Sequence, residues 1–323
     1  MPNGKESCNM PFIDLHCDTF LELQRQNKEL YDNDLHISLK KLMKSDVFCQ
    51  FFAMYVNLAK FENDTQAFDF ALSMYEVFKT ELKKNKAYIA QVCSAAELEE
   101  ARRNGKIAAL LTVEEGGICG SSIERLEKLY DMGVRLVTLT WNYENSLGYP
   151  NSDEPDIMGA GLKPFGIEFI ERMQQLGMLI DVSHLSEGGF WDVVKYSKKP
   201  FVASHSNARS VRDFRRNLTD AQLKALAEAG GVTGINFYHN FLGTDGSGSM
   251  EQIIAHIRQM KNIAGIDVIA VGSDFDGISG NTAMKDASEL TMLIDALDKA
   301  GFTDGEIDKI CWKNALRVIK DVL

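Results

Sequence analysis

Short apolar runs alternate with amphipathic stretches along nearly the whole chain. The apolar runs are rich in β-branched and aromatic residues, which is typical of buried strands. They lie at residues 12–16, 47–56, 107–115, 134–141, 178–184, 201–205, 232–238 and 268–276. Amphipathic stretches at 123–133, 220–231 and 250–265 predict helices, and each ends on a glycine, the residue type favoured just after a helix.

Eight strands that alternate with helices predict a closed parallel (β/α)8 barrel, the TIM-barrel architecture. An open doubly wound sheet is the alternative, but no Gly-x-Gly-x-x-Gly motif follows the first strand. Residues 65–104 predict a helical insertion that contains one short strand, YIAQV. Because no low-complexity linker divides the chain, we expect residues 1–323 to form a single domain.

Charge and composition narrow the class of partner. The 323 residues carry a formal net charge of −11, which argues against nucleic acid or an anionic membrane surface as a partner, since both attract clustered cations. The six cysteines have no Cys-x-x-Cys spacing, and residues 1–12 have no apolar leader segment. We therefore expect a cytoplasmic protein with reduced thiols and without a membrane anchor.

Polar residues of metal-binding type follow five of the predicted strands. These residues are His16, Asp18, Glu114, Glu115, His184, His205, Asp274 and Asp276. In a barrel of this kind all strands end at one face, so these side chains are expected to meet there. A single histidine at a strand end is more often structural, and an Asp-Gly pair is often a plain turn.

The set as a whole has a stronger implication than its members. So many buried carboxylates and imidazoles would cost several kcal/mol unless a divalent cation compensates their charge. Imidazole mixed with carboxylate suits zinc, with manganese, cobalt or iron as alternatives. Three His, one Asp and one Glu exceed the three protein ligands of one open zinc site, so they predict two metal ions that share a carboxylate. Two such ions can hold a bridging hydroxide and polarise a carbonyl, which is hydrolytic chemistry.

The same residues carry a resemblance to a known family. The chain resembles the membrane (renal) dipeptidase family, peptidase family M19, whose members are zinc dipeptidases of the amidohydrolase superfamily. The shared motifs are DLHCDT (14–19), EEGGI (114–118), GLKPFG (161–166), LIDVSHLS (179–186), ASHSNARSV (203–211), RRNL (215–218), INFY (235–238) and GSDFDG (272–277). They extend over nearly the whole length in the family's order.

This resemblance implies a ligand set. It implies that His16, Asp18 and Glu115 bind one zinc ion, and that Glu115 bridges to a second zinc ion. It implies that His184 and His205 complete the second site. We choose Glu115 over its neighbour Glu114 because the family's glutamate directly precedes Gly-Gly.

The resemblance also implies roles around the metals. Asp274 is expected to be the acid/base that serves the bridging water and the leaving amine. Arg216 is expected to bind the terminal carboxylate of the dipeptide, since a guanidinium pairs with a carboxylate in bidentate fashion. A homodimer is expected as well.

One position departs from the family. The membrane-anchored relatives have a substrate-contacting histidine where this chain has Trp141. Since an indole offers only an N–H donor, substrate orientation must come from Trp141, Asn142 or Tyr143, or from the metals alone. Trp141 could also simply pack. We include Tyr238 among the expected substrate contacts, and we expect His36 and His256 at the surface.

The sequence therefore predicts a zinc-dependent dipeptidase that uses two divalent cations and takes small dipeptides, with tolerance of a C-terminal D-residue left open. An amidohydrolase that acts on another small amide or a lactone is the alternative, because one metal centre serves many substrates. The alternative outside the enzymes is a protein that binds metal without catalysis. The complete ligand set together with Asp274 disfavours this alternative.

Overall fold

The fold is known from a computed structural model, which describes residues 10–323. The expectation about residues 1–12 therefore falls largely outside the described part, as does Cys8. Within that part, no helix combines the length and the apolar character needed to cross a bilayer. The five cysteines that it includes are free thiols.

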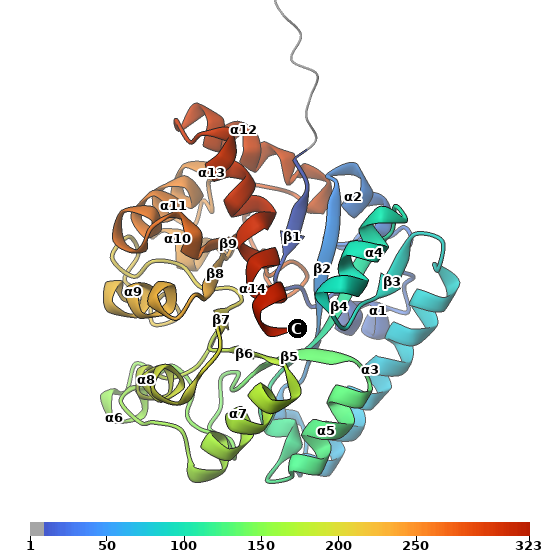
Figure 1. Cartoon of the computed structure of the whole chain (residues 1–323), viewed down its shortest axis with the longest axis vertical. Coiled ribbons are helices and arrows are strands. Elements are labelled where there is room, and N and C mark those ends of the chain that lie inside the picture. Colours follow the sequence, from blue (N-terminus) through green and yellow to red (C-terminus); the bar gives the residue numbers. More distant parts are fainter. Residues whose placement is uncertain (1–9) are drawn as a thin grey trace, which may run out of the picture.

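Parallel strands form a closed barrel at the centre of the molecule (Figure 1). The order around the barrel is β1, β2, β4, β5, β6, β7, β8 and β9, and β9 pairs with β1. The strand bounds are β1 Phe12–Asp14, β2 Val47–Tyr55, β3 Ile89–Gln91, β4 Ile107–Glu114, β5 Val134–Thr138, β6 Leu179–Asp181, β7 Val202–Ala203, β8 Val232–Ile235 and β9 Ile269–Val271. The predicted (β/α)8 barrel is thus confirmed, with a strand inside each of the eight predicted runs.

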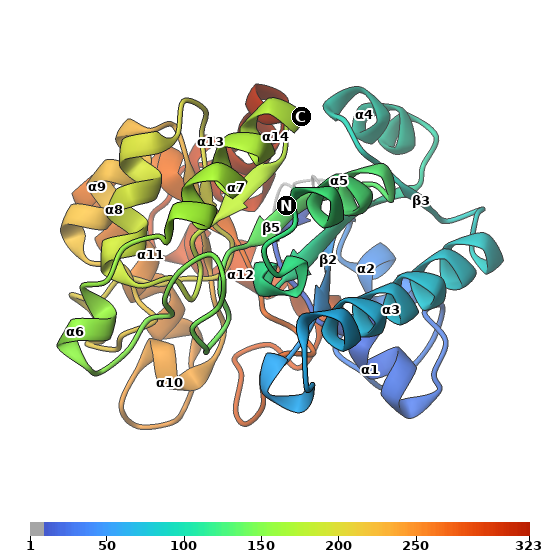
Figure 2. The same cartoon turned by 90° about the horizontal axis from the view of Figure 1, so that it is seen from below.

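Helices surround this barrel (Figures 1 and 2). Their bounds are α1 Thr19–Gln26, α2 Leu39–Lys44, α3 Asp64–Lys84, α4 Ala95–Arg103, α5 Ile123–Asp131, α6 Pro155–Met158, α7 Pro164–Leu176, α8 Glu187–Tyr196, α9 Asp220–Glu228, α10 His239–Leu242, α11 Met250–Ala264, α12 Thr291–Lys299, α13 Asp304–Asp308 and α14 Asn314–Val322. Three of the helices begin with complete capping boxes, at Thr219, Ser249 and Thr303, in which side chains satisfy the free N–H groups of the first turn.

The predicted insertion lies between β2 and β4 and consists of α3, β3 and α4. β3 pairs with the first residues of β4, from Ile107 to Ala109. From Leu111 onward, the same edge of β4 pairs with β5. β3 therefore lies at the amino-terminal end of the barrel, whereas α3 also contacts the turn Gly116–Cys119 that follows β4.

The strands separate two apolar regions. Side chains on their outer faces pack against the helices, whereas inner side chains such as Leu110, Leu136 and Ala270 form a second cluster inside the barrel. This arrangement explains why β4 reads as an almost continuous apolar run, because parallel strands in a barrel are buried on both faces. The inner cluster continues into Val318 and Ile319 of α14, which lies across the amino-terminal end of the barrel (Figure 1).

Candidate metal centre

The carboxyl ends of the strands bring the predicted ligands together. We call this end of the barrel the mouth. His16 and Asp18 follow β1, Glu114 is the last residue of β4, and His184, His205 and Asp274 follow β6, β7 and β9. All of them except Asp274 are buried, and the side chain of Asp274 is only 13% exposed.

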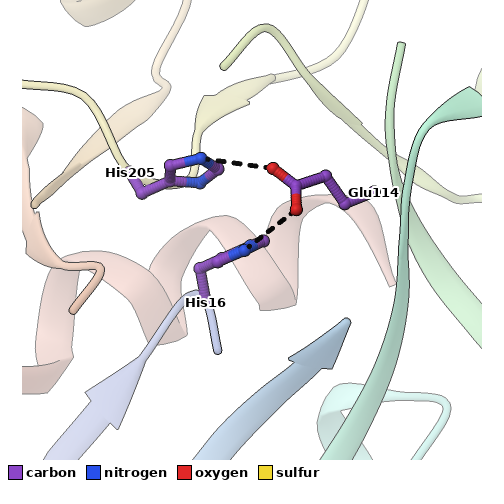
Figure 3. A group of neighbouring side chains, drawn as sticks. All are labelled: His16, Glu114 and His205. Carbon is purple, nitrogen blue, oxygen red and sulfur yellow. Dashed lines mark ion pairs between the residues drawn. The ribbon is translucent and has the colours of Figure 1, made fainter. Parts of the chain in front are cut away.

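The carboxylate of Glu114 faces the rings of both His16 and His205 (Figure 3). Its Oε2 is 3.5 Å from Nε2 of His16, and its Oε1 is 3.0 Å from Nε2 of His184 and 3.5 Å from Nε2 of His205. Burial alone would raise the pKa of Glu114, but His16 and His184 hold it below its usual value. One carboxylate therefore contacts histidines from three different strand ends.

The structure contradicts the choice of Glu115 as the shared carboxylate. Successive side chains of a strand point to opposite faces, so only Glu114 of the two faces the barrel axis. Glu115 has a left-handed backbone, and its Oε1 accepts hydrogen bonds from Gly117 N at 2.7 Å and Asn145 Nδ2 at 2.5 Å. Its Oε2 accepts one from Trp141 N at 3.1 Å. Glu115 thus fastens the loop after β5, and burial raises its pKa to about 7.

Hydrogen bonds fix the ring tautomers of two of the histidines. Nδ1–H of His184 donates to Oδ1 of Asn142 at 3.0 Å. Nδ1–H of His205 donates to the hydroxyl of Ser204 at 2.7 Å, because that hydroxyl uses its own proton toward Asp181 at 2.6 Å. Burial lowers the pKa of His184 to about 4 and that of His205 well below its usual value, so both rings are neutral at pH 7.

The unprotonated Nε2 atoms of these two neutral rings lie 3.0 Å apart and face Oε1 of Glu114. Three lone-pair donors at such distances repel one another unless a cation lies among them. Neutral imidazole held through its other nitrogen is the form that binds a metal. The donor set at this position therefore fits a divalent cation.

His16 forms the second part of the centre with two carboxylates. Its Nε2 lies 3.5 Å from Oδ2 of Asp18 and 3.8 Å from Oδ1 of Asp274. Neither ring nitrogen of His16 nor Oδ1 of Asp18 has a hydrogen-bond partner among residues 10–323, although all three atoms are buried. Such buried, unpaired polar atoms are rare in proteins, and their positions suit the ligands of a cation. The groups His16–Asp18–Asp274 and His16–Glu114–His205 each bring three ligand atoms within 4.8 Å of one another.

Burial also raises the pKa values of the carboxyl groups in this part of the centre. It raises the pKa of Asp18 to about 6 and that of Asp274 to about 7, with further contributions from neighbouring carboxylates. For His16, burial lowers the pKa, but Glu114 and Asp18 outweigh that effect and raise it well above its usual value. An excess of negative charge therefore surrounds His16.

Backbone strain is concentrated at the mouth. Glu115, His184, Asp274 and Asp276 all have positive φ angles, of 110°, 69°, 61° and 67°. Residues with a Cβ avoid this region at a cost of about 1–2 kcal/mol each, and such strain gathers at functional sites. Of these residues, His184 and Asp274 direct their side chains toward the centre, whereas the carboxylates of Glu115 and Asp276 accept hydrogen bonds from neighbouring loops.

A cavity of about 300 Å³ lies over the centre. Of the expected substrate contacts, Trp141, Asn142 and Tyr238 line it, whereas Tyr143 lines a neighbouring hollow with Glu144 and Tyr149. Trp141 also packs edge-to-face on Tyr55 with ring centroids 4.9 Å apart. The indole of Trp141 therefore both packs against Tyr55 and lines the cavity.

The cavity also includes residues that no sequence motif indicated. They come from α1, the end of β2, α10 and the loop after β9, and they are Leu21, Glu22, Arg25, Tyr55, Phe241, Ile278 and Ser279. Tyr55 is the last residue of β2 and stands one residue before the end of the predicted run 47–56, at the level of its partner Glu114 on β4. That position at a strand end was the one signal that could have identified Tyr55.

Arg216 lies behind His205 rather than in the cavity wall. It is 6% exposed and donates to Oγ of Ser206 at 3.2 Å and to the carbonyl oxygen of His205 at 3.3 Å. Its Nε has no hydrogen-bond partner, and no carboxylate of the described chain forms an ion pair with it. Burial lowers its pKa to about 10, so it stays charged at neutral pH. The guanidinium thus carries a buried positive charge available to an anion.

The expectation for the other histidines was wrong for His256. It is fully buried between α11 and the loops beside it, where Nδ1 accepts a hydrogen bond from Ala208 N at 3.1 Å and Nε2–H donates to Leu242 O at 3.1 Å. His36 is partly exposed, and its Nδ1 accepts a hydrogen bond from Asp276 N at 2.9 Å.

Comparison with known families identifies the class. The family model described as membrane dipeptidase (peptidase family M19) matches residues 7–323. The chain therefore belongs to the membrane dipeptidase family, a family of metal-dependent dipeptidases.

Curated proteins similar to this chain include one that is named a dipeptidase. An uncharacterized protein from the pqqA 5′ region of Klebsiella pneumoniae is 39% identical over 239 residues, which cover 71% of this chain and 87% of the relative. An uncharacterized dipeptidase of Schizosaccharomyces pombe is 31% identical over 339 residues, which cover 98% of this chain and 82% of the relative.

Solved structures share the fold over almost the whole chain. A metallopeptidase described as a dipeptidase of family M19 has a TM-score of 0.89 at 27% identity, covering 97% of this chain and 99% of its own. A metallopeptidase from Rhodobacter sphaeroides, bound to a phosphinate mimic of the dipeptide L-Ala-D-Ala, has a TM-score of 0.88 at 26% identity with the same coverage.

Proposed function

We propose that this protein hydrolyses the peptide bond of dipeptides with two divalent metal ions, and that the native ions are zinc. The observation that carries the proposal is the position of Glu114. Its two oxygens face separate groups of ligands, His16 with Asp18 on one side and His184 with His205 on the other. A shared carboxylate between two ligand groups is what a two-metal hydrolase requires.

The ligands are assigned accordingly. His16, Asp18 and Glu114 would hold one ion, and Glu114, His184 and His205 the other. When bound, the two ions would lower the pKa of a water molecule, which becomes the attacking hydroxide, and would polarise the scissile carbonyl.

The acid/base role falls to Asp274. Its Oδ2 accepts a hydrogen bond from Asn236 Nδ2 at 2.8 Å, which leaves Oδ1 directed toward His16 and the cavity. From that position Oδ1 can accept a proton from the attacking water and pass it to the departing nitrogen. A carboxylate held at one oxygen and free at the other suits such a transfer.

We retain Arg216 as the group that would bind the terminal carboxylate of the dipeptide, although its side chain lines a small hollow beside His184 and Ser206 and not the cavity over the centre. Trp141, Asn142 and Tyr238 would contact the substrate along the cavity wall. The L-Ala-D-Ala mimic bound to the Rhodobacter sphaeroides relative supports a test of dipeptides with a C-terminal D-residue. A cytoplasmic location and a homodimer stay predictions from the sequence.

The primary test is steady-state kinetics on a panel of L-X-L-X and L-X-D-X dipeptides, with metal content measured before and after chelation. Chelated enzyme should be inactive and should recover with added zinc. Stoichiometric metal without hydrolysis of any panel member would contradict the proposal.

The role of Asp274 is tested by Asp274→Asn. Loss of a general acid/base costs about 10²–10⁴-fold in rate, so kcat should fall in that range while both metal ions stay bound. An activity close to that of the wild type would overturn the assignment.

The substrate class is tested with dipeptides amidated at the C-terminus. Hydrogen bonds to charged groups are worth about 1.5–3 kcal/mol, so kcat/KM for the amide should fall about 10–100-fold. Equal rates for acid and amide would favour a hydrolase of other small amides or lactones instead.

A further inference from the structure

Two buried aspartates beneath the centre make the same set of hydrogen bonds. Asp14 at the end of β1 accepts four: from His16 N at 3.4 Å, Gln50 Nε2 at 3.0 Å, Ser273 N at 2.8 Å and Ser273 Oγ at 2.6 Å. Gln50 lies on β2 and Ser273 follows β9, so Asp14 joins its own strand to both neighbours.

Asp181 at the end of β6 repeats this pattern. It accepts hydrogen bonds from Ser183 N at 2.9 Å, Thr138 Oγ1 at 2.6 Å, Ser204 N at 2.8 Å and Ser204 Oγ at 2.6 Å. Thr138 lies on β5 and Ser204 follows β7, the two neighbours of β6. We call Asp14 with Ser273 the first bracket and Asp181 with Ser204 the second bracket.

Each bracket ends beside a different functional residue. Ser273 directly precedes Asp274, and its hydroxyl also accepts a hydrogen bond from Phe275 N at 3.1 Å, so both peptide neighbours of Asp274 are fixed. Ser204 directly precedes His205 and accepts the Nδ1–H of that ring at 2.7 Å. The first bracket therefore holds a backbone, whereas the second also holds a ring tautomer.

The brackets meet beneath the centre. A Cβ atom on Gly272, the residue before Ser273, would collide with the carbonyl oxygen of Ser204, so this close contact requires glycine. The effects of the two brackets nevertheless differ. The first bracket supports the strained left-handed backbone of Asp274. The second bracket supports the ring of His205, whose orientation does not depend on that backbone.

We propose that the two brackets are separate positioning devices: Asp14–Ser273 keeps Asp274 in its reactive position, and Asp181–Ser204 keeps His205 in its metal-binding tautomer. The proposal rests on the roles assigned to Asp274 and His205 above. Asp14, Ser273, Asp181 and Ser204 are positioning residues, since each acts through a neighbour.

Ser204→Ala and Ser273→Ala test the proposal, with metal content measured over a series of buffered free zinc concentrations. Ser204→Ala should weaken retention of one zinc ion about 10–100-fold, the usual cost of losing such a partner, and saturating zinc should restore kcat. Ser273→Ala should retain both ions, lower kcat about 10–100-fold with little change in KM, and gain nothing from added zinc.

Thr112→Val serves as the control. Thr112 is a buried residue of β4 whose hydroxyl has no hydrogen-bond partner in the described part of the chain, and it belongs to neither bracket. Loss of the Thr112 hydroxyl should change neither zinc retention nor kcat. Melting temperatures of all three variants show whether a loss of activity merely follows a loss of stability.

Several results would overturn the proposal. Equal zinc retention in both serine variants, rescue of Ser273→Ala by zinc, or losses of activity that track the melting temperature would each do so. If the wild-type enzyme binds zinc but cleaves no dipeptide, the proposed function fails instead, and zinc retention by Ser204→Ala still decides the role of the second bracket.

Discussion

The mouth of the barrel and its amino-terminal end are built by the same strands but held together by different forces. At the amino-terminal end, Leu110 and Leu136 pack with Val318 and Ile319 of α14 in a purely apolar cluster. At the mouth, four residues further along β4, Glu114 stands among histidines and carboxylates. Burial is nearly complete in both places.

The difference teaches how one barrel can combine stability with chemistry. Apolar packing is non-directional and contributes in proportion to the area removed from water. The mouth depends on directed hydrogen bonds, strained backbone and uncompensated charge, all of which cost stability until a cation is bound. We therefore expect changes at the amino-terminal end to alter unfolding alone, and changes at the mouth to alter metal binding and turnover.

The largest effect should separate two adjacent residues of the mouth, Glu114 and Glu115. Glu114→Gln removes the charge shared by the two ligand groups, so metal affinity should fall by about 100-fold or more, beyond the loss seen for second-sphere partners. Glu115→Gln should keep its metals, because the carboxylate of Glu115 accepts its hydrogen bonds from Gly117, Asn145 and Trp141 and contacts no proposed ligand. Metal analysis of both variants checks this, and the reverse outcome would return the bridging role to Glu115.

Ile319→Ala tests the role of the apolar cluster at the amino-terminal end of the barrel. Deletion of a buried isoleucine side chain typically costs about 2–5 kcal/mol, so the free energy of unfolding should fall by that amount while kcat of the folded enzyme stays constant. Lys320→Ala on the exposed side of the same helix is the matched control and should change stability by less than about 0.5 kcal/mol. A drop in kcat for Ile319→Ala at full folding would show that the two ends are coupled.

Removal of metal should destabilise the mouth alone. A ligand present at about 100 times its dissociation constant stabilises the folded state by about 2.7 kcal/mol, so chelation should lower the melting temperature accordingly. The shift should be the same in wild type and Ile319→Ala, since distant effects add within about 0.5 kcal/mol. Unequal shifts in calorimetry would argue against independent ends.

The smallest effect concerns His256, a buried histidine outside the mouth whose two nitrogens are both satisfied. Burial lowers its pKa to about 4, whereas an unfolded histidine titrates near 6.5. As the pH falls from about 6.5 to 4, only the unfolded state gains this proton, so the folded state should lose on the order of 1–2 kcal/mol between pH 7 and pH 5. Denaturant unfolding of wild type and His256→Gln should show this loss in the wild type only; parallel curves would refute it.

Much of the architecture could be predicted from the sequence because periodicity carries it. Each of the eight strands lies within a run recognised from its apolar residues, and α3, β3 and α4 fall within the predicted insertion apart from Asp64, the first residue of α3. The site was predictable as a set, since His16, His184, His205 and Asp274 all stand two or three residues beyond the end of a strand.

Other features could not be predicted, for identifiable reasons. The choice between Glu114 and Glu115 depends on which face of β4 lies inside the barrel, and the motif misled us because Glu115, not Glu114, precedes the glycines. His256 follows a helical pattern that does not reveal the loops covering it. The two brackets join residues such as Asp14 and Ser273, which are 259 positions apart.

The amino-acid sequence by itself determined the barrel, the family and the residue types of the centre, because periodicity and motif order are local properties that a linear chain records. Only the tertiary structure decided that Glu114 faces the centre, that Arg216 lies buried behind His205, and that paired aspartates support the strand ends. These properties depend on distances between strands that closure of the barrel sets, and no local pattern encodes such distances.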